Sequence, residues 1–358
     1  MLAANKSVPL SAIKLNKSVL IFSLEMSNYR IILAGQFIFN NQRSFEMALA
    51  QYNQRVEIHF KYDVFLRSEN IFDVEQNCLN IPRHVEPEIT DRTWRNTVSA
   101  LETVCEYAIA GSLSAWKLEN GKIIEYREIE PNGDKSAIQS YLLGKRLVGK
   151  GEDKAAKDAL DQAIQKCERH AKAYERRGYV NFRLKNFKDA LYDFNKSIVV
   201  NPHSEEAHFG RAFVRIVEKD YVSAIKDFDI TLKNSIPHQP IFWKTKRIKG
   251  ECHLILGEYK MAILELIPVS KRVFLEDDNN FGWQRKVWFN LGQAYLGEEN
   301  FKEAIIALEK AKGLPEGKDN LSKEDIDGLI KEAKSGKVPS QYRNPLPGNI
   351  KTGAPFLS

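Results

Sequence analysis

Apolar residues in the second half of the chain recur at helical spacing, in pairs of segments joined by short polar turns. In residues 287–311 the first segment places its apolar and small residues on one helical face, at Trp288, Leu291, Gly292 and Tyr295. The turn 296–300 interrupts this pattern, and a second helical face follows at Phe301, Ala304, Leu308 and Ala311. The pattern predicts two antiparallel helices, whose backbones approach closely where Gly292 and Ala304 are small.

The same pattern repeats with a period of 34 residues. Small residues that would allow contact between two helices lie 34 positions apart, at Gly144, Gly178 and Ala212. An alanine follows 12 residues after each, and a large apolar residue 16 residues after each, giving Ala156 and Leu160, Ala190 and Phe194, and Ala224 and Phe228. One hairpin of helices cannot bury its apolar face alone, whereas stacked neighbours can. Residues 137–318 therefore predict an array of stacked helical hairpins.

These residues resemble the tetratricopeptide repeat family, with which they share the 34-residue period and the pattern of Trp, Leu, Gly, Tyr, Ala and Phe. The resemblance covers roughly half of the chain and implies five repeats, at about 137–170, 171–204, 205–238, 243–276 and 285–318. The fourth repeat departs from the pattern, because Lys246 and Lys249 stand where apolar residues are expected. Residues 322–335 predict a capping helix that Ser322 opens with an S-x-x-D pattern. The predicted fold is an N-terminal α+β domain followed by an all-α tetratricopeptide superhelix.

The resemblance also implies where a partner would bind. Such arrays form a superhelix whose concave groove is lined by the first helix of each repeat, and members bind peptides or extended segments of other proteins. The groove positions of this chain are Tyr141, Lys172, Tyr179, Phe182, Arg183, Phe209, Phe213, Ile216, Lys244, Arg247, Lys286 and Phe289. Their aromatic members favour a protein or peptide partner that carries apolar or aromatic side chains. A subgroup that binds the C-terminal carboxylate of heat-shock chaperones needs a set of Lys, Asn and Arg positions that no three successive repeats supply, so that partner is not predicted.

Residues 19–131 have a different pattern and predict a separate α+β domain. Residues 18–23, 29–39 and 55–66 are rich in β-branched and aromatic residues, and the last segment alternates apolar and polar residues as a half-buried strand does. Residues 44–54 suit a short helix, and residues 93–111 suit a longer one that Gly111 would end. A β-hairpin is predicted around Asn120 and Gly121, which form a strong turn signal.

Composition and charge add two basic arms to this picture. The 358 residues are 43% hydrophobic and 28% charged, with a net charge of +6, which is ordinary for a globular protein. Residues 1–18 and 336–358 contain Lys or Arg but no Asp or Glu, and the second arm is rich in Pro and Gly, which suits an extended segment. No apolar stretch is long enough for a membrane helix or the core of a secretion signal, so we expect a cytoplasmic protein without a membrane partner.

Residues that could carry chemistry are few. The four cysteines are scattered and the seven histidines form no ligand motif, so no metal, cofactor or catalytic residue is predicted. Residues 144–151, GKRLVGKG, come one residue short of a phosphate-binding loop, with Gly151 in place of the required hydroxyl residue. Because the repeat pattern places this segment in a helix and the turn after it, we interpret the likeness as accidental. The expected function is a non-enzymatic scaffold for protein–protein interaction. A structural subunit of a larger assembly is one form that such a scaffold would take.

Two alternatives stay open at this stage. The basic arms, together with an aromatic strand carrying Arg55, Lys61 and Arg67, would suit a nucleic-acid-binding factor. This alternative is not favoured, because the same pattern describes any amphipathic sheet. The second alternative is an enzyme in the N-terminal domain, to which the repeats would recruit substrate.

Overall fold

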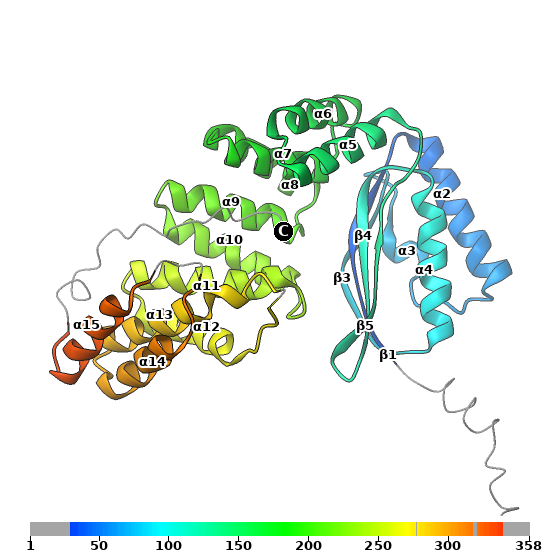
Figure 1. Cartoon of the computed structure of the whole chain (residues 1–358). Helices are drawn as coiled ribbons and strands as arrows, with labels where there is room; N and C mark the ends of the chain where they lie inside the picture. Colours follow the sequence, from blue (N-terminus) through cyan, green and yellow to red (C-terminus); the bar gives the residue numbers. More distant parts are fainter. Residues whose placement is uncertain (1–28, 277, 318–320, 339–358) are drawn as a thin grey trace, which may run out of the picture. The chain divides into compact units, whose positions relative to one another are not determined.

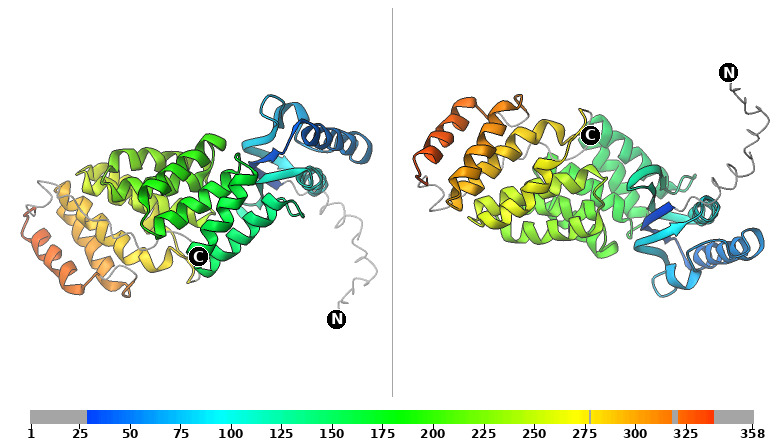
Figure 2. Two further views of the ribbon diagram at one scale, coloured as in Figure 1. Left: turned by 90° about the horizontal axis from the view of Figure 1, so that it is seen from above. Right: turned by 90° about the horizontal axis from the view of Figure 1, so that it is seen from below.

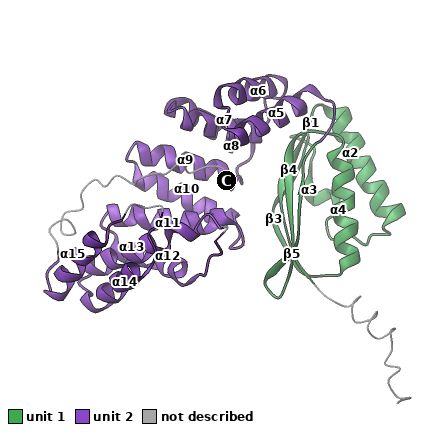
Figure 3. Ribbon diagram, viewed as in Figure 1, with its two compact units in different colours: residues 1–131 green, residues 132–358 purple. Residues whose placement is uncertain are grey.

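A β-sheet with two helices and a helical array form separate units of the chain, residues 1–131 and 132–358 (Figure 3). The computed structural model describes residues 29–276, 278–317 and 321–338. The predicted basic arms at 1–18 and 336–358 therefore lie outside the described residues, except for 336–338, and so does the strand predicted at 18–23.

The first unit is built on a five-stranded antiparallel sheet with strand order β2-β3-β1-β4-β5. The strands are β1 (Tyr29–Phe39), β2 (Phe72–Asp73), β3 (Cys78–Ile89), β4 (Ala108–Glu119) and β5 (Lys122–Ile129). Helices α2 (Gln42–Gln54) and α4 (Asp91–Cys105) cover one face of the sheet (Figure 1), and the short α3 (Ser68–Ile71) precedes β2. The core lies between this face and the helices, where Phe37, Trp94 and Leu101 are almost fully buried. The predictions of β1, of a helix at 44–54 and of the hairpin at Asn120 and Gly121 are confirmed.

The strand predicted at 55–66 is wrong. Helix α2 instead continues into a π-helical turn, η2 (Arg55–His59), and the chain reverses at Lys61 and Tyr62, whose φ angles are 50° and 64°. Val56 and Phe60 are four residues apart and pack on the core, whereas Ile58 is 63% exposed. The apolar residues therefore follow a helical period, which a run this short also allows. The aromatic strand that the nucleic-acid alternative required does not form.

Two other features of the sheet differ from the sequence prediction. Gly111 does not end a helix, because α4 stops at Cys105 and Gly111 lies within β4, where a Cβ atom would sit 2.0 Å from the backbone oxygen of Gln36. Strand β3 was not predicted at all. Its two prolines, Pro82 and Pro87, interrupt the pattern of a strand and are tolerated because β2 covers only the first residues of its outer edge.

The second unit consists of five helical hairpins followed by a capping helix (Figures 1 and 2). The hairpins are α5 (Ser136–Lys150) with α6 (Asp153–Lys166), α7 (Ala171–Arg183) with α8 (Phe187–Val200), α9 (Glu205–Val217) with α10 (Tyr221–Asn234), α11 (Pro240–Ile255) with α12 (Tyr259–Lys271), and α13 (Gln284–Gly297) with α14 (Phe301–Gly313). A short 3-10 turn, η3 (Phe281–Trp283), precedes α13. The capping helix is α15 (Lys323–Lys334), and the predicted capping box forms between Ser322 and Asp325.

The small residues of the repeat pattern lie where the two helices of a hairpin touch. A Cβ atom on Gly178 would lie 2.8 Å from the ring of Phe194, and one on Gly292 would lie 2.5 Å from Leu308. The near phosphate-binding loop is part of the same arrangement, because residues 144–150 belong to α5 and Gly151 ends that helix with a φ of 75°. The strand, loop and helix that a phosphate-binding loop requires are therefore not formed there.

An ion pair links the two helices in each of the three central hairpins. It joins residues 16 positions apart, in the pairs Arg177 and Asp193, Arg211 and Asp227, and Lys249 and Glu265. The acidic members are almost completely buried, with Asp193 and Asp227 each 1% exposed. Lys249 and Lys246 both donate to Glu265, at 2.6 and 2.9 Å. Lys246 and Lys249, which depart from the sequence pattern of the fourth repeat, therefore both form ion pairs with Glu265.

Candidate partner-binding face

The first helices of the five hairpins, α5, α7, α9, α11 and α13, lie along one side of the array and are here called the first-helix face. α5 contacts α7, α7 contacts α9, and α11 contacts α13. All twelve residues predicted to line a groove belong to these five helices. Their role as contacts for a partner stays a prediction.

The apolar members of the predicted set are largely buried within the array. Tyr179, Phe182, Phe209, Phe213 and Ile216 are each at most 8% exposed. They form one cluster with side chains of the second helices, in which the ring centroids of Phe209 and Phe228 lie 5.9 Å apart. These apolar residues therefore belong to the buried core of the array. Phe289, on α13, differs from them because it is only partly buried.

Basic side chains of the first-helix face lie over aromatic rings. Lys244 Nζ is 5.7 Å from the ring centroid of Phe209. Arg247 and Lys286 both approach the ring of Trp283, with Arg247 Cζ at 4.1 Å and Lys286 Nζ at 5.7 Å from its centroid. These five residues are called the cation–aromatic cluster below. A cation held over a ring gains favourable electrostatic energy, more so where water is excluded.

Glu251 is the carboxylate that balances part of this positive charge. Its Oε1 accepts a 2.9 Å hydrogen bond from Arg247, and its Oε2 lies 3.6 Å from Lys286 Nζ. One helical turn beyond Lys286, Asn290 is 4% exposed, and its Nδ2 has no hydrogen-bond partner. Trp283 and Glu251 were missed by the sequence analysis, Trp283 because it precedes the fifth repeat.

A second group of charges joins α7 and α9. Lys172 donates to Glu206 at 2.5 Å and to Glu175 at 3.3 Å, and Ser204 donates to Glu175 at 2.9 Å. Burial alone would lower the pKa of Lys172, but Glu175 and Glu206 outweigh it and raise that pKa. Burial and the charge of Glu206 raise the pKa of Glu205 to about 7. Carboxyl groups that titrate near neutrality are concentrated at functional sites, although structural networks produce them too.

The two remaining cationic and aromatic positions have partners inside the array. Arg183 forms an ion pair with Asp153 of α6. Tyr141 packs on the imidazole of His170, with ring centroids 4.6 Å apart.

His170 provides a prediction about pH. Its Nδ1 accepts the Ala173 backbone N–H at 3.2 Å at the start of α7, and burial lowers the pKa of its imidazole to about 3. In the unfolded chain this group protonates near pH 6.5, so its contribution to stability is present above that pH and is lost as pH falls towards 3. We expect His170→Asn, which keeps a capping side chain, to reduce the pH dependence of the unfolding free energy between pH 6 and 4 by about 1.4 kcal/mol per pH unit.

Urea unfolding across that pH range measures this slope. The exposed His203 supplies the control, because His203→Asn should leave the slope almost unchanged. Equal slopes in the wild type and the His170 variant would contradict the prediction.

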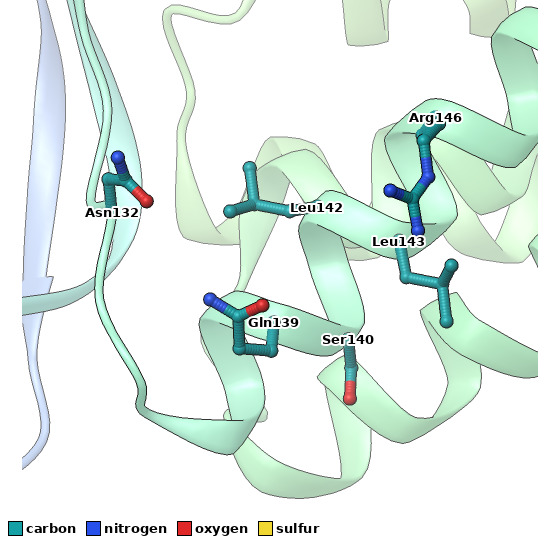
Figure 4. Close-up of a pocket in the computed structure, with 6 residues that line it drawn as sticks. All are labelled: Asn132, Gln139, Ser140, Leu142, Leu143 and Arg146. Atoms are coloured by element: carbon teal, nitrogen blue, oxygen red, sulfur yellow. The ribbon is translucent and has the colours of Figure 1, made fainter.

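Two pockets in the described part of the chain are lined by residues outside the predicted groove set. One, of about 450 Å³, is bordered by the entry to the second unit and by α5, with lining residues Asn132, Gln139, Ser140, Leu142, Leu143 and Arg146 (Figure 4). Gln139 donates to the Gly133 carbonyl at 2.8 Å and so fixes this entry segment. The other, of about 470 Å³, lies in the first unit between the end of α2 and residues 62–69.

Within the described ranges, no group of three or more His, Cys, Asp or Glu side chains is placed to hold a metal ion. None of the helices that the structure describes has the length and apolar character needed to cross a membrane.

Comparison with known proteins decides the family of the repeats. Family models described as tetratricopeptide repeat match residues 141–205 and 286–317. The helical unit is a tetratricopeptide repeat array. The two matches cover the first two hairpins and the last one, at both ends of the array. Tetratricopeptide repeats are protein-interaction modules and are generally not enzymes, which supports a general role of this unit in protein–protein interaction.

Individual proteins show more limited similarity to the tetratricopeptide array. A curated relative, the Protein SGT1 homolog of Bos taurus, is 31% identical over 77 residues, which are 22% of this chain and 23% of that protein, so less than a quarter of the relative is matched. The crystal structure of MamA is 16% identical and aligns with 49% of this chain and 90% of its own, with a TM-score of 0.42. YrrB, described as a TPR protein with an unusual peptide-binding site, is 19% identical and aligns with 56% of this chain and 94% of its own, with a TM-score of 0.43.

Proposed function

We propose that this chain is a non-enzymatic adaptor that binds an extended segment of a partner protein along the first-helix face. The cation–aromatic cluster of Phe209, Lys244, Arg247, Trp283 and Lys286 carries the proposal. It combines three positive side chains with two aromatic rings on three successive hairpins, and Glu251 is the carboxylate paired with two of those cations.

The chemistry of the cluster selects the kind of partner. Phe209 and Arg247 are buried, whereas Lys244, Lys286 and Trp283 are partly exposed and present both charge and apolar surface. This combination suits a segment carrying carboxylates next to apolar or aromatic residues. Asn290, whose buried Nδ2 has no hydrogen-bond partner, adds a donor one turn from Lys286, and a carbonyl or carboxylate of the bound segment would satisfy it. The proposed partner is therefore an acidic segment with an aromatic or aliphatic anchor.

Selection from a displayed library of random peptides tests this proposal without a known partner. The wild-type chain is expected to enrich acidic peptides that contain aromatic residues. The double variant Lys244→Glu/Lys286→Glu should weaken binding of the selected peptides at least tenfold, because both charges contacted by the peptide are reversed. Lys260→Glu, at an 83%-exposed side chain on α12, is the control and should bind as the wild type does.

The same proteins distinguish the nucleic-acid alternative. A fluorescent single-stranded oligonucleotide is titrated with each protein at several salt concentrations, since phosphate contacts produce a steep loss of affinity with salt. Tight, salt-sensitive binding of the oligonucleotide together with no enriched peptide class would refute the adaptor proposal in favour of the alternative. Enriched peptides that bind the double variant as tightly as the wild type would place the binding site elsewhere on the chain.

A further inference from the structure

We propose that two copies of this chain pair through strand β5, so that their two sheets become one continuous antiparallel sheet across a two-fold axis. Among the described residues, β5 is the last strand of the sheet and hydrogen-bonds only to β4. A strand in this position presents backbone N–H and C=O groups along its outer side, and these groups are a template for pairing with another strand.

The two edges of the sheet differ in their protection. On the opposite side, β2 pairs only with the first two residues of β3, and the rest of β3 carries Pro82 and Pro87. Proline has no N–H group and is a common means of preventing pairing at an edge. Strand β5 is eight residues long and has no proline, and its register shift against β4 lies at Ile124, before the segment that starts at Glu125. Proline therefore hinders pairing only at the β3 edge.

The strand pairing establishes which way the β5 side chains point. Glu125 lies opposite Lys117 of β4 and accepts a 3.0 Å hydrogen bond from Trp94 Nε1 of α4, so Glu125 and Arg127 lie on the helix side of the sheet. Tyr126 lies opposite Trp116 on the other side, with their ring centroids 5.6 Å apart. Glu125 also accepts a 2.9 Å hydrogen bond from Arg127 of the same strand.

The sequence of β5 is complementary to itself in one register. Two copies related by a two-fold axis through Tyr126 place each Glu125 opposite the Arg127 of the other copy. Opposite charges in this position stabilise a strand pair, and like charges destabilise it. Side chains that face each other across a strand pair must lie on the same side of the sheet. The registers next to the proposed one are therefore those in which the two-fold axis passes through Glu125 or through Arg127. These would oppose two carboxylates or two guanidinium groups.

Apolar groups at the edge would also gain from pairing. The side chains of Tyr126 and Ile124 are 49% and 48% exposed. In the proposed register the two Tyr126 rings lie beside each other, which extends the Trp116–Tyr126 stack of each copy into a row of four rings. Aromatic pairs across neighbouring strands are among the more stabilising contacts in sheets.

Light scattering coupled to size-exclusion chromatography of the full chain tests the proposal. The wild type is expected to form a dimer. Arg127→Glu places a carboxylate opposite Glu125 of the other copy, so it should raise the dimer dissociation constant at least tenfold. Glu125→Lys should have the same effect, because it opposes two cations. A mixture of these two variants should form a heterodimer, since each Glu then faces a Lys or Arg of the other chain.

Cysteine cross-linking measures the register itself. Tyr126→Cys places two thiols at the two-fold axis, whereas Glu128→Cys places them about 14 Å apart, four residues along the partner strand. The four native cysteines are buried and do not compete. A short bismaleimide should join the first variant and not the second. A wild type that stays monomeric up to about 100 µM, a dimer insensitive to both charge variants, or equal cross-linking of the two cysteine variants would overturn the proposal.

Discussion

Replacing Asp227 by alanine is expected to lower the free energy of unfolding at pH 7 by about 3–5 kcal/mol. The Asp227 carboxylate is 1% exposed and accepts hydrogen bonds from Arg211 at 2.7 and 3.0 Å and from Arg215 at 2.7 Å. Its Oδ1 also lies 3.2 Å from Nδ1 of the buried His208. Removing the carboxylate leaves two guanidinium groups partly buried without their shared partner, which costs more than the pair itself contributes.

The contribution of Asp227 depends on pH in a direction that its surroundings define. Burial alone would raise the pKa of Asp227, but the hydrogen bond with His208 and the charges of Arg211 and Arg215 lower it overall. The stabilisation is therefore present above the ordinary pKa of an aspartate and is lost as pH falls through the lowered value. Consequently the difference in stability between the wild type and Asp227→Ala should shrink in acid.

Urea unfolding followed by circular dichroism measures both effects. Asp161 provides a matched control, because it also accepts a hydrogen bond from an arginine of the array, Arg177, yet is 38% exposed. Asp161→Ala should cost no more than about 1 kcal/mol, as exposed ion pairs do. Equal effects of the two substitutions would show that burial does not determine the strength of these pairs.

Gly210→Ala is expected to destabilise the array by about 1–3 kcal/mol through overpacking. A Cβ atom on Gly210 would lie 2.3 Å from Cε1 of Phe194, whose ring is completely buried and also contacts Gly178. The ring lies between two glycines from successive first helices and is completely buried, so it cannot turn out into solvent to relieve the clash. The control is Gly328→Ala in α15, where a Cβ atom would meet nothing within 4 Å. That substitution should stabilise the chain by about 0.5–1 kcal/mol, because alanine favours a helix over glycine.

A double-variant cycle identifies Phe194 as the cause of the Gly210 effect. The hairpins of α5, α11 and α13 have leucine at the position of Phe194, at Leu160, Leu266 and Leu308. In a Phe194→Leu background the smaller side chain should leave room for the added methyl group, so Gly210→Ala should cost less than it does in the wild type. If the two substitutions are additive in their unfolding free energies, the clash with Phe194 is not the source of the destabilisation.

The repeat array could be predicted from the sequence because its signals are local. The 34-residue period, the helical spacing of apolar residues and the small residues at helix contacts all concern neighbours within one or two turns or one hairpin. The capping box of Ser322 and Asp325 is equally local, and it forms as predicted. For the same reason the first-helix positions could be assigned to their helices before any contact was known.

The tertiary structure decided what depends on distant partners. An alternating run such as 55–66 satisfies both a strand and a short helical turn, and only packing of Val56 and Phe60 on the core selected the turn. Whether Gly111 ends a helix or lies in a strand depended on β1, which approaches it closely.

The same division holds for the candidate site. The sequence by itself determined that the chain carries a tetratricopeptide array, and it assigned the predicted partner contacts to the first helices of the hairpins. Only the tertiary structure decided that Phe209 and Phe213 face the interior, and that Lys244, Arg247 and Lys286 lie over aromatic rings. The physical reason is that helix formation depends on neighbours along the chain, whereas burial and charge pairing depend on residues that only the folded chain brings together.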